Sequence, residues 1–322
     1  MSSWGAPWRL IVSLLRSVFL NRGVFPLTPP ALFAIIFAEV KSGEGSGISI
    51  RISILASGSA GNSTLLETGR TTLLIDAGIG KKELTRRFAA LGRAFPDGVD
   101  AILVTHEHSD HSHAVAQLAR HWNCPAYLTE PTHREIVKMY AEDPENPGRK
   151  ATFERIEYVR AGERFEIGDV EINAFRIPHD AADPVGFAFR ANGTKLAITT
   201  DLGYLPEHVK QHLREADFLM LESNHDIEML KVGPYPWHIK QRVMSRTGHL
   251  SNNVVSDFLS DSEMFDARPR HLVLAHLSEQ NNHPEIARLS AEQALAARAV
   301  DFAFRGSLHV ASQRSPLGPF EL

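Results

Sequence analysis

The chain has 322 residues, of which 43% are hydrophobic, and a formal net charge of −4 at pH 7. This length suffices for one large domain or two small ones. The slight acidic excess is atypical of nucleic-acid-binding proteins, which usually carry a basic surplus, but it does not exclude a local basic groove. The single cysteine, Cys124, excludes an intrachain disulfide and agrees with a cytoplasmic protein.

Residues 1–47 differ in composition from the rest of the chain. Arginines alternate with apolar residues, no acidic residue precedes Glu39, and residues 41–47 form a glycine- and serine-rich linker. The apolar runs are shorter than the roughly 20 residues needed to span a bilayer, so no stable membrane insertion is expected. We interpret this segment as a flexible extension or an over-long translation start, with a targeting or membrane-surface role as the alternative. The folded domain is then expected over residues 48–322.

The folded part is expected to begin with a strand over residues 48–55, where apolar and polar side chains alternate. The small-residue loop 56–63 follows, and its composition is compatible both with backbone amides presented to an anion and with a plain hairpin loop. A second strand, residues 71–75, ends in Asp76. Because an unpaired buried charge is costly, we expect Asp76 to orient a ligand residue. Leu84, Phe88 and Leu91 then recur at helical spacing.

A dense group of metal-binding residue types follows a third apolar strand, residues 101–104. It reads His106-Glu107-His108-Ser109-Asp110-His111. An extended backbone points residues i and i+2 to the same side, so His106 and His108 can reach one ion. Asp110 and His111, adjacent in a turn that opens the next helix, can face a second ion. Three histidines and an aspartate at this spacing predict a metal site.

Amphipathic helices and short apolar strands alternate through the rest of the chain. Helices are expected from Val115 to Trp122, over residues 131–141 and after Pro284, with a polar loop at 142–148. The expected strands are residues 153–159, 165–167, 170–177, 186–190, 195–199, 272–275 and 307–310. The tail after Ser312 is expected to be loose. This alternation predicts an α/β fold built in layers.

Several motifs resemble those of one known superfamily. His106-x-His108-x-Asp110-His111 resembles the HxHxDH signature of the metallo-β-lactamase superfamily. Five further motifs resemble the YycJ/WalJ/VicX group of single-domain hydrolases within it. They are SGSAGN at 57–62, LMLESNHD at 219–226, GPYPW at 233–237, GHLS at 248–251 and LAHLSEQNN at 274–282. The resemblance covers roughly residue 48 to the C-terminus and implies a four-layer αβ/βα sandwich, in which two mixed sheets pack face to face with helices outside.

The resemblance also implies a centre with two divalent metal ions, whose ligands come from several strand ends. The implied ligands are His106, His108 and His179 for the first ion, Asp110, His111 and His276 for the second, and Asp201 bridging both. A solvent oxygen between two dications would supply hydroxide near neutral pH, and the ions would stabilise negative charge on the substrate. Histidine and carboxylate ligands suit zinc and manganese alike, so the sequence leaves the metal identity open.

Three residues are expected to take part in catalysis: Asp110, Glu222 and His249. By analogy with related tRNA-processing enzymes, His249 would donate a proton to the leaving group or contact the substrate phosphate. Glu222 would hold the imidazole of His249 in place. His225 competes for the role of His249, and either histidine could instead be a structural residue at a strand end.

Residues 229–256 contain no acidic side chain, while four cations are interleaved with Tyr235 and Trp237. Cations beside aromatic rings suit a nucleic-acid strand, although a solvated amphipathic helix shows the same pattern. The expected substrate-binding residues are Asn62, Trp237, Lys240 and Arg242. Since the resembling group is associated with exonuclease activity, the predicted function is a phosphodiesterase that degrades DNA in the 5′ to 3′ direction. The alternatives are hydrolysis of a small ester, thioester, lactone or cyclic phosphodiester, and a non-catalytic regulatory protein with the same fold.

Overall fold

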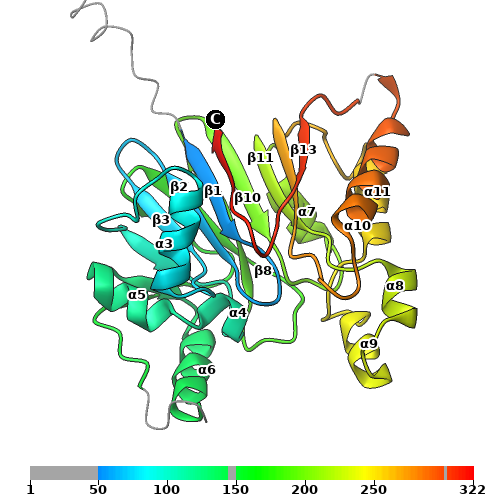
Figure 1. The fold of residues 1–322 in the computed structure, drawn as a ribbon. Coiled ribbons are helices and arrows are strands. Elements are labelled where there is room, and N and C mark those ends of the chain that lie inside the picture. Colours follow the sequence, from blue (N-terminus) through cyan, green and yellow to red (C-terminus); the bar gives the residue numbers. More distant parts are fainter. Residues whose placement is uncertain (1–49, 144–149, 301–302) are drawn as a thin grey trace, which may run out of the picture. The chain divides into compact units, whose positions relative to one another are not determined.

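Two seven-stranded sheets make up the centre of the described chain, which comprises residues 50–143, 150–300 and 303–322 of a computed structural model (Figure 1). The predictions for residues 1–47 and most of the loop 142–148 lie outside these residues. The first sheet has the order β14-β1-β2-β3-β4-β5-β6. Its strands are β1 (Arg51–Ala56), β2 (Ser63–Glu67), β3 (Thr72–Ile75), β4 (Ala101–Leu103), β5 (Ala126–Leu128), β6 (Ile156–Tyr158) and β14 (Leu317–Glu321).

The second sheet has the order β13-β12-β11-β10-β9-β8-β7. Its strands are β7 (Arg164–Ile167), β8 (Val170–Arg176), β9 (Val185–Ala191), β10 (Thr194–Thr199), β11 (Phe218–Glu222), β12 (His271–Ala275) and β13 (Ser307–Val310). Strands β3 to β6 of the first sheet run parallel, as do β10 to β13 of the second. Parallel strands end at the same edge of a sheet, so their carboxyl-terminal loops gather there.

Helices cover the outer face of each sheet. On the first sheet these are α3 (Lys81–Ala90), α5 (Val115–Trp122) and α6 (Glu130–Ala141), and on the second α7 (Glu207–Leu213), α10 (Asn252–Ser260) and α11 (Pro284–Ala296). The short helices α4 (Ser109–Ser112), α8 (Ile227–Val232) and α9 (Trp237–Val243) lie beyond the strand ends (Figure 1). The described residues thus form the predicted four-layer αβ/βα sandwich (Figure 1).

Side chains on alternating strand positions fill three separate hydrophobic clusters. In β11, Phe218 and Met220 face the core between the two sheets, whereas Leu219 and Leu221 pack beneath the outer helices. A third cluster joins the outer face of the first sheet to α3, α5 and α6. Because both faces of the central strands are buried, these strands are continuous apolar runs rather than alternating ones.

The C-terminal tail differs from its prediction. Residues after Ser312 were expected to be loose, yet β14 pairs antiparallel with β1, with Arg51 opposite Glu321 and Ile52 opposite Phe320. Phe320 is only 7% exposed and belongs to the core between the sheets. The strand therefore covers the outer edge of β1 and adds an aromatic side chain to the core. The sequence immediately around Phe320 predicts neither contact.

The loop between β1 and β2 is a hairpin connection, one of its two predicted alternatives. The amides of Gly58, Ala60, Gly61 and Asn62 all donate to protein acceptors, so they are not available to an anion. Among the described residues, none of the helices is long and apolar enough to cross a membrane.

Candidate metal centre

The predicted ligand residues meet where strands of both sheets end. Asp76 follows β3, Asp201 follows β10 and His276 follows β12. All three have a left-handed backbone, with φ of 60°, 62° and 54° respectively. Such a conformation is costly for residues other than glycine and marks positions that the surrounding structure holds in place. Here the sharp turn directs each side chain across the end of its sheet.

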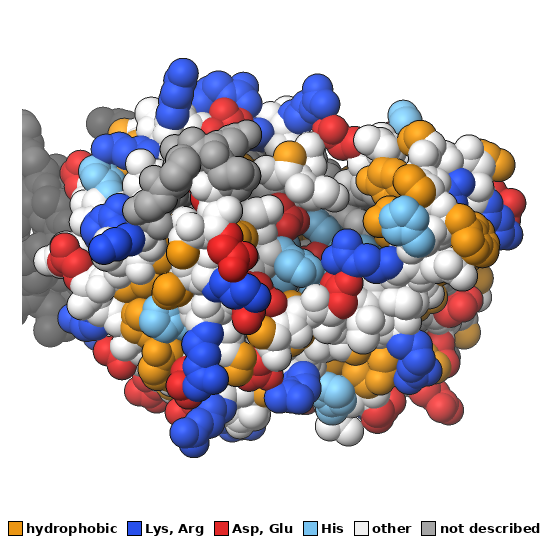
Figure 2. All heavy atoms as spheres, turned by 90° about the horizontal axis from the view of Figure 1, so that it is seen from below, with side chains coloured by type: hydrophobic (Ala, Val, Ile, Leu, Met, Phe, Trp, Pro, Cys, Tyr) orange, Lys and Arg blue, Asp and Glu red, His pale blue; other side chains and the backbone are white. Residues whose placement is uncertain are grey.

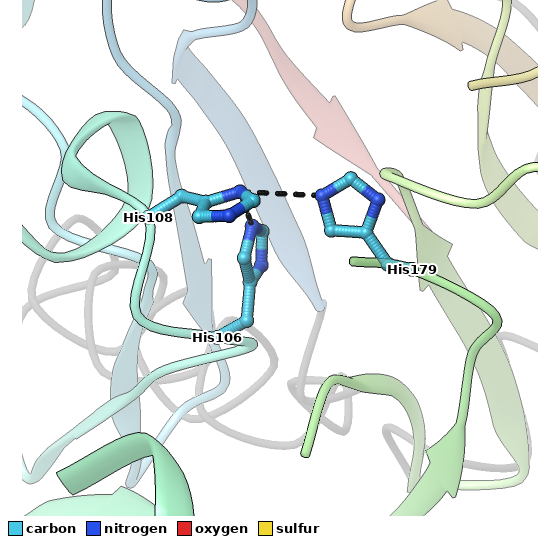
Figure 3. A group of neighbouring side chains, drawn as sticks. All are labelled: His106, His108 and His179. Atoms are coloured by element: carbon cyan, nitrogen blue, oxygen red, sulfur yellow. Dashed lines mark hydrogen bonds between the residues drawn. The ribbon is translucent and has the colours of Figure 1, made fainter. Parts of the chain in front are cut away.

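His106, His108 and His179 form the first group of converging side chains (Figure 3). Nδ1 of His108 lies 3.1 Å from Nε2 of His106 and 3.2 Å from Nε2 of His179. The first two come from the loop after β4, and His179 reaches them from the loop after β8 (Figure 3). The structure thus brings together the three residues that the resemblance implies for the first ion.

Asp110, His111 and His276 form the second group, and Asp201 lies between the two groups. Oδ2 of Asp110 is 3.4 Å from Nε2 of both His111 and His276. Asp201 Oδ2 is 3.1 Å from Nε2 of His111, and its Oδ1 is 3.9 Å from Nε2 of His179. One carboxylate therefore faces a histidine of each group, as expected of a bridging ligand.

The hydrogen bonds of four histidines leave the same ring nitrogen directed into the centre. Their Nδ1 atoms lie 2.8–3.2 Å from oxygens elsewhere, and their Nε2 atoms face Nδ1 of His108 or a carboxylate. The pairs are His106 with Thr105 Oγ1, His111 with Asp76 Oδ2, His179 with the Gly248 carbonyl, and His276 with Glu222 Oε1. A metal-binding histidine characteristically uses one ring nitrogen for the ion and bonds the other to an oxygen.

Asp201 gives a second test of whether these residues fit a cation. Its carboxylate is 2% exposed, and Oδ2 has no hydrogen-bond partner among the described residues, because its approach to His111 lacks hydrogen-bond geometry. A buried carboxylate oxygen without a donor is costly, and a cation would supply the missing partner. The residues present therefore fit divalent metal ions.

The carboxylates of the centre are held ionised. Burial raises the pKa of Asp110, but the neighbouring His111 and His276 outweigh it and hold the pKa well below its ordinary value. Burial likewise raises the pKa of Asp201, and His276 and His111 lower it by more. Ionised oxygens are the form that binds a metal, so the electrostatics agree with the geometry.

Glu222 and His249 adopt the predicted arrangement. The Glu222 carboxylate is fully buried, and its Oε1 is 2.9 Å from Nδ1 of His249. Burial lowers the pKa of His249, but the charge and the hydrogen bond of Glu222 raise it by more. The competing candidate, His225, is also buried, but it belongs to neither ligand group and its Nδ1 has no partner among the described residues.

The four predicted substrate-binding residues occupy different environments. Nδ2 of Asn62 is buried at the centre, 2.9 Å from Nε2 of His111 and 3.2 Å from Oδ2 of Asp110. Trp237 is 63% exposed at the start of α9. Arg242 binds the carboxylate of Asp180, the neighbour of His179, with Nη2 3.1 Å from Oδ1.

Lys240 does not fit its predicted role. Its side chain is buried, and Nζ donates to the carbonyl of Lys231 at 2.7 Å, which ties α9 to α8. The ammonium group already has an internal acceptor, so it is not presented to a substrate. The charge pattern of the sequence did not distinguish this structural lysine from an exposed one.

Two supporting residues were not predicted. Ser57 Oγ accepts a hydrogen bond of 2.8 Å from the backbone amide of His276. Asp180 lies next to His179 in the chain, and its Oδ1 is 3.5 Å from Nε2 of His179, while the same carboxylate binds Arg242. The Ser57–His276 and Asp180–Arg242 contacts join segments far apart in the chain, so the local sequence does not predict them.

Comparisons with known proteins agree with this geometry. Residues 71–277 match the family described as "Beta-lactamase superfamily domain". The chain is 38% identical over 246 residues to exodeoxyribonuclease YycJ of Bacillus anthracis, covering 76% of this chain and 89% of that protein. It is 37% identical over 251 residues to exodeoxyribonuclease WalJ of Streptococcus pneumoniae, covering 78% and 90%.

The chain belongs to the metallo-β-lactamase superfamily and is YycJ/WalJ-like. It is a metal-dependent hydrolase.

Solved structures show the same fold at much lower identity. The metallo-β-lactamase fold protein YhfI of Bacillus subtilis superposes with a TM-score of 0.60 at 16% identity, covering 85% of this YycJ/WalJ-like chain and 100% of YhfI. The short form of human tRNase Z superposes with a TM-score of 0.54 at 16% identity, covering 84% and 99%.

The centre lies in a hollow on one face of the molecule. Figure 2 shows histidine side chains in this hollow, with acidic side chains and lysine or arginine side chains on its rim. Hydrophobic side chains gather beside it, on the side where Figure 1 places α8 and α9. A substrate that reaches the histidines from solvent therefore passes charged and apolar surface.

Proposed function

We propose that this chain is a two-metal phosphodiesterase that degrades DNA in the 5′ to 3′ direction. The observation that carries the proposal is the pair of ligand groups joined by Asp201, because two adjacent cations suit the displacement of one phosphate oxygen by another. The choice of DNA is supported by the relatives in Bacillus anthracis and Streptococcus pneumoniae, both named exodeoxyribonuclease.

We assign the ligands as the resemblance implies them. His106, His108 and His179 would hold one ion, Asp110, His111 and His276 would hold the other, and Asp201 would be shared. Two divalent ions, zinc or manganese, would supply hydroxide near neutral pH and stabilise negative charge on the phosphate oxygens. Asp76 and Thr105 accept from Nδ1 of His111 and His106, which favours the tautomers whose Nε2 carries no proton and can bind an ion.

His249 is assigned as the proton donor to the leaving oxygen. Its Nδ1 bonds to Glu222, which leaves Nε2 for the substrate, and Glu222 raises its pKa so that the protonated form persists nearer neutral pH. Glu222 acts through His249 and is a positioning residue. Arg242 is assigned to contact the substrate phosphates, because it lies beside His179 and its side chain is 53% exposed. Asn62 is buried with Nδ2 directed at Asp110 and His111, so it is assigned as a positioning residue for these two ligands.

The proposal is tested with DNA labelled at its 5′ or 3′ end, incubated with protein loaded with zinc, manganese or magnesium. We expect early release of 5′-terminal label as short products while the 3′ label stays in long fragments. Asp110→Ala should remove the activity, because it deletes a ligand of the second group. If the loaded wild-type protein left this DNA intact while hydrolysing bis(p-nitrophenyl) phosphate, the assignment to DNA would be wrong.

We also infer a cytoplasmic location for this protein. The lone Cys124 is buried and unpaired with another cysteine, as is usual in a reducing compartment, and the proposed substrate is found there in bacteria such as the two relatives.

A further inference from the structure

The exposed face of α9 stands out beside the metal centre. Around the helix, Ile239, Lys240 and Val243 point inward, whereas Trp237, Gln241 and Met244 follow one exposed line and His238 and Arg242 follow another. Trp237 is 63% exposed, a large value for this side chain, and Met244 on the same line is 40% exposed. An aromatic and an apolar side chain exposed along one line of a helix, beside a candidate site, mark this line as a contact surface.

Several contacts hold α9 firmly against the centre. Arg242 binds Asp180 through two nitrogens, and the amide of Asp180 donates to the carbonyl of Thr247 at 3.1 Å. The next residue, Gly248, accepts from Nδ1 of His179 at 3.2 Å. Two residues before Arg242, Lys240 ties α9 to α8. The helix is therefore a fixed part of the rim.

The spacing along α9 relates the two exposed lines. Trp237 and Arg242 are five residues apart, which is about 7.5 Å along a helix axis. The two positions are also about 140° apart around the helix, so Trp237 and Arg242 flank the exposed face on opposite sides. The guanidinium side lies next to His179 through Asp180, so a strand that crosses this face on its way to the centre can meet both side chains.

The charges around α9 suit a polyanion. Residues 229–256 contain no aspartate or glutamate. Arg242 pairs with Asp180, yet its side chain is still 53% exposed. Arg246 is also exposed, and its guanidinium lies 4.1 Å from the centre of the Tyr204 ring. The apolar line alone would suit a protein partner as well as a nucleic acid. The cationic line beside it favours a strand that carries phosphates and stackable bases.

We propose that the exposed face of α9 binds the unpaired end of a nucleic-acid strand, with Trp237 stacking on a base and Arg242 contacting a phosphate of the same strand. The inference rests on the proposed nuclease function and adds that the strand is held single-stranded at the rim. Bases present a π face whatever their identity, so this contact confers little sequence preference.

The test compares kcat and KM of Trp237→Ala, Trp237→Phe and wild type on a 5′-overhang oligonucleotide and on bis(p-nitrophenyl) phosphate, which has no base to stack on α9. Trp237→Ala should raise KM for the oligonucleotide by roughly 5- to 150-fold, the range expected for one lost base stack, with kcat retained. Trp237→Phe should recover most of the loss. Leu289→Ala, which removes a 47% exposed apolar side chain from α11, is the matched control and should behave like wild type.

A binding measurement covers the case in which Trp237→Ala disturbs the helix. A phosphorothioate oligonucleotide, which resists hydrolysis, should quench tryptophan fluorescence of the wild-type protein and not that of Trp237→Phe. Equal quenching, or an unchanged KM ratio between the two substrates, would overturn the inference while leaving the nuclease proposal intact.

Two further outcomes would also overturn the inference. If Trp237→Ala lost the same activity on both substrates, α9 would serve to support the metal centre. If Trp237→Ala changed the molecular mass of the protein in solution while DNA hydrolysis stayed unchanged, the face would be a contact between copies of the chain. If wild type hydrolysed only the small diester, the nuclease proposal itself would fail, which is a different result.

Discussion

Replacing Glu222 by glutamine tests how a buried carboxylate holds the centre together. Glu222 Oε2 accepts from the backbone amides of Leu202 at 3.1 Å and Leu250 at 3.0 Å, and Oε1 is 2.9 Å from Nδ1 of both His249 and His276. A glutamine keeps one acceptor oxygen and turns an NH2 group toward two of these four donors. Because the backbone donors cannot turn away, we expect the NH2 group to face the two imidazoles.

The expected cost follows from these contacts. In the metal-free protein, as long as both imidazoles keep their Nδ1 protons, each buried donor left without an acceptor costs about 1–3 kcal/mol, so the two should lower the free energy of unfolding by about 2–6 kcal/mol. The pKa gives a second figure: burial raises the pKa of Glu222, but His249 and the hydrogen bonds from both histidines outweigh it and lower the pKa from 4.5 to about 2. That lowering corresponds to about 3 kcal/mol.

The pH dependence has a definite sign. Because the pKa of Glu222 is lower in the folded protein, its stabilisation is complete above pH 4.5 and is lost as the pH falls toward about 2. The difference in unfolding free energy between wild type and Glu222→Gln should therefore narrow as the pH is lowered through this window. Urea unfolding with excess chelator, at about pH 7, 4 and 3, measures the difference without a contribution from bound metal.

A matched control is Glu228→Gln on α8. This carboxylate is 77% exposed and pairs with Lys231, so its loss should cost less than about 1 kcal/mol. A loss below about 1 kcal/mol for Glu222→Gln, or a difference that stays constant on acidification, would refute the reasoning.

The same substitution should also weaken metal binding. If the NH2 group of Gln faces His276, Nδ1 of His276 must accept a hydrogen bond, and its proton moves to Nε2. That nitrogen faces Asp110 and would no longer offer a lone pair to an ion. Metal affinity should fall by about 10- to 100-fold, which titration with zinc or manganese measures.

Further expectations concern the ligands, a tight backbone contact and the last strand. Asp110→Ala should reduce phosphodiester hydrolysis by at least roughly 100-fold and lower the bound metal, measured by hydrolysis rates and elemental analysis. Gly78→Ala should destabilise the fold and lower metal content, because its Cβ would lie 1.7 Å from the Asp110 carbonyl, whereas Gly98→Ala meets no atom within 4 Å and should melt like wild type. Phe320→Ala should lower the free energy of unfolding by about 3–5 kcal/mol in urea, and a loss under about 1 kcal/mol would mean that β14 contributes little to the core. Chelator should lower the melting temperature, and zinc or manganese should restore it, because only the folded state gathers the ligands.

Sequence reasoning succeeded where the signal is local. His106, His108, Asp110 and His111 fall within six residues, and their spacing alone predicts two adjacent groups of ligand atoms. Asp76 was expected to orient a ligand because it follows an apolar strand, and its Oδ2 lies 2.8 Å from Nδ1 of His111. Such inferences need only the geometry of a strand and its turn.

Other features depend on contacts between distant segments. Lys240 and Arg242 share one charge pattern, yet only Lys240 turns inward, because the carbonyl of Lys231 lies within its reach. The residues around Phe320 show no alternation of apolar and polar side chains that would predict a strand. The strand forms because it pairs with the edge of β1. Asn62 was expected at the substrate, and the hairpin loop brings it directly against His111 and Asp110.

By itself, the sequence determined the type of fold, the metal-binding cluster at the end of β4 and the family whose motifs the chain carries. The later members of the centre, His179, Asp201 and His276, were located through that resemblance. Only the tertiary structure decided how they meet, because parallel strands of two sheets end at a common edge and a left-handed backbone at Asp201 and His276 turns the side chains inward. The physical reason is that spacing along a chain sets local geometry, whereas convergence of distant residues depends on how the sheets pack.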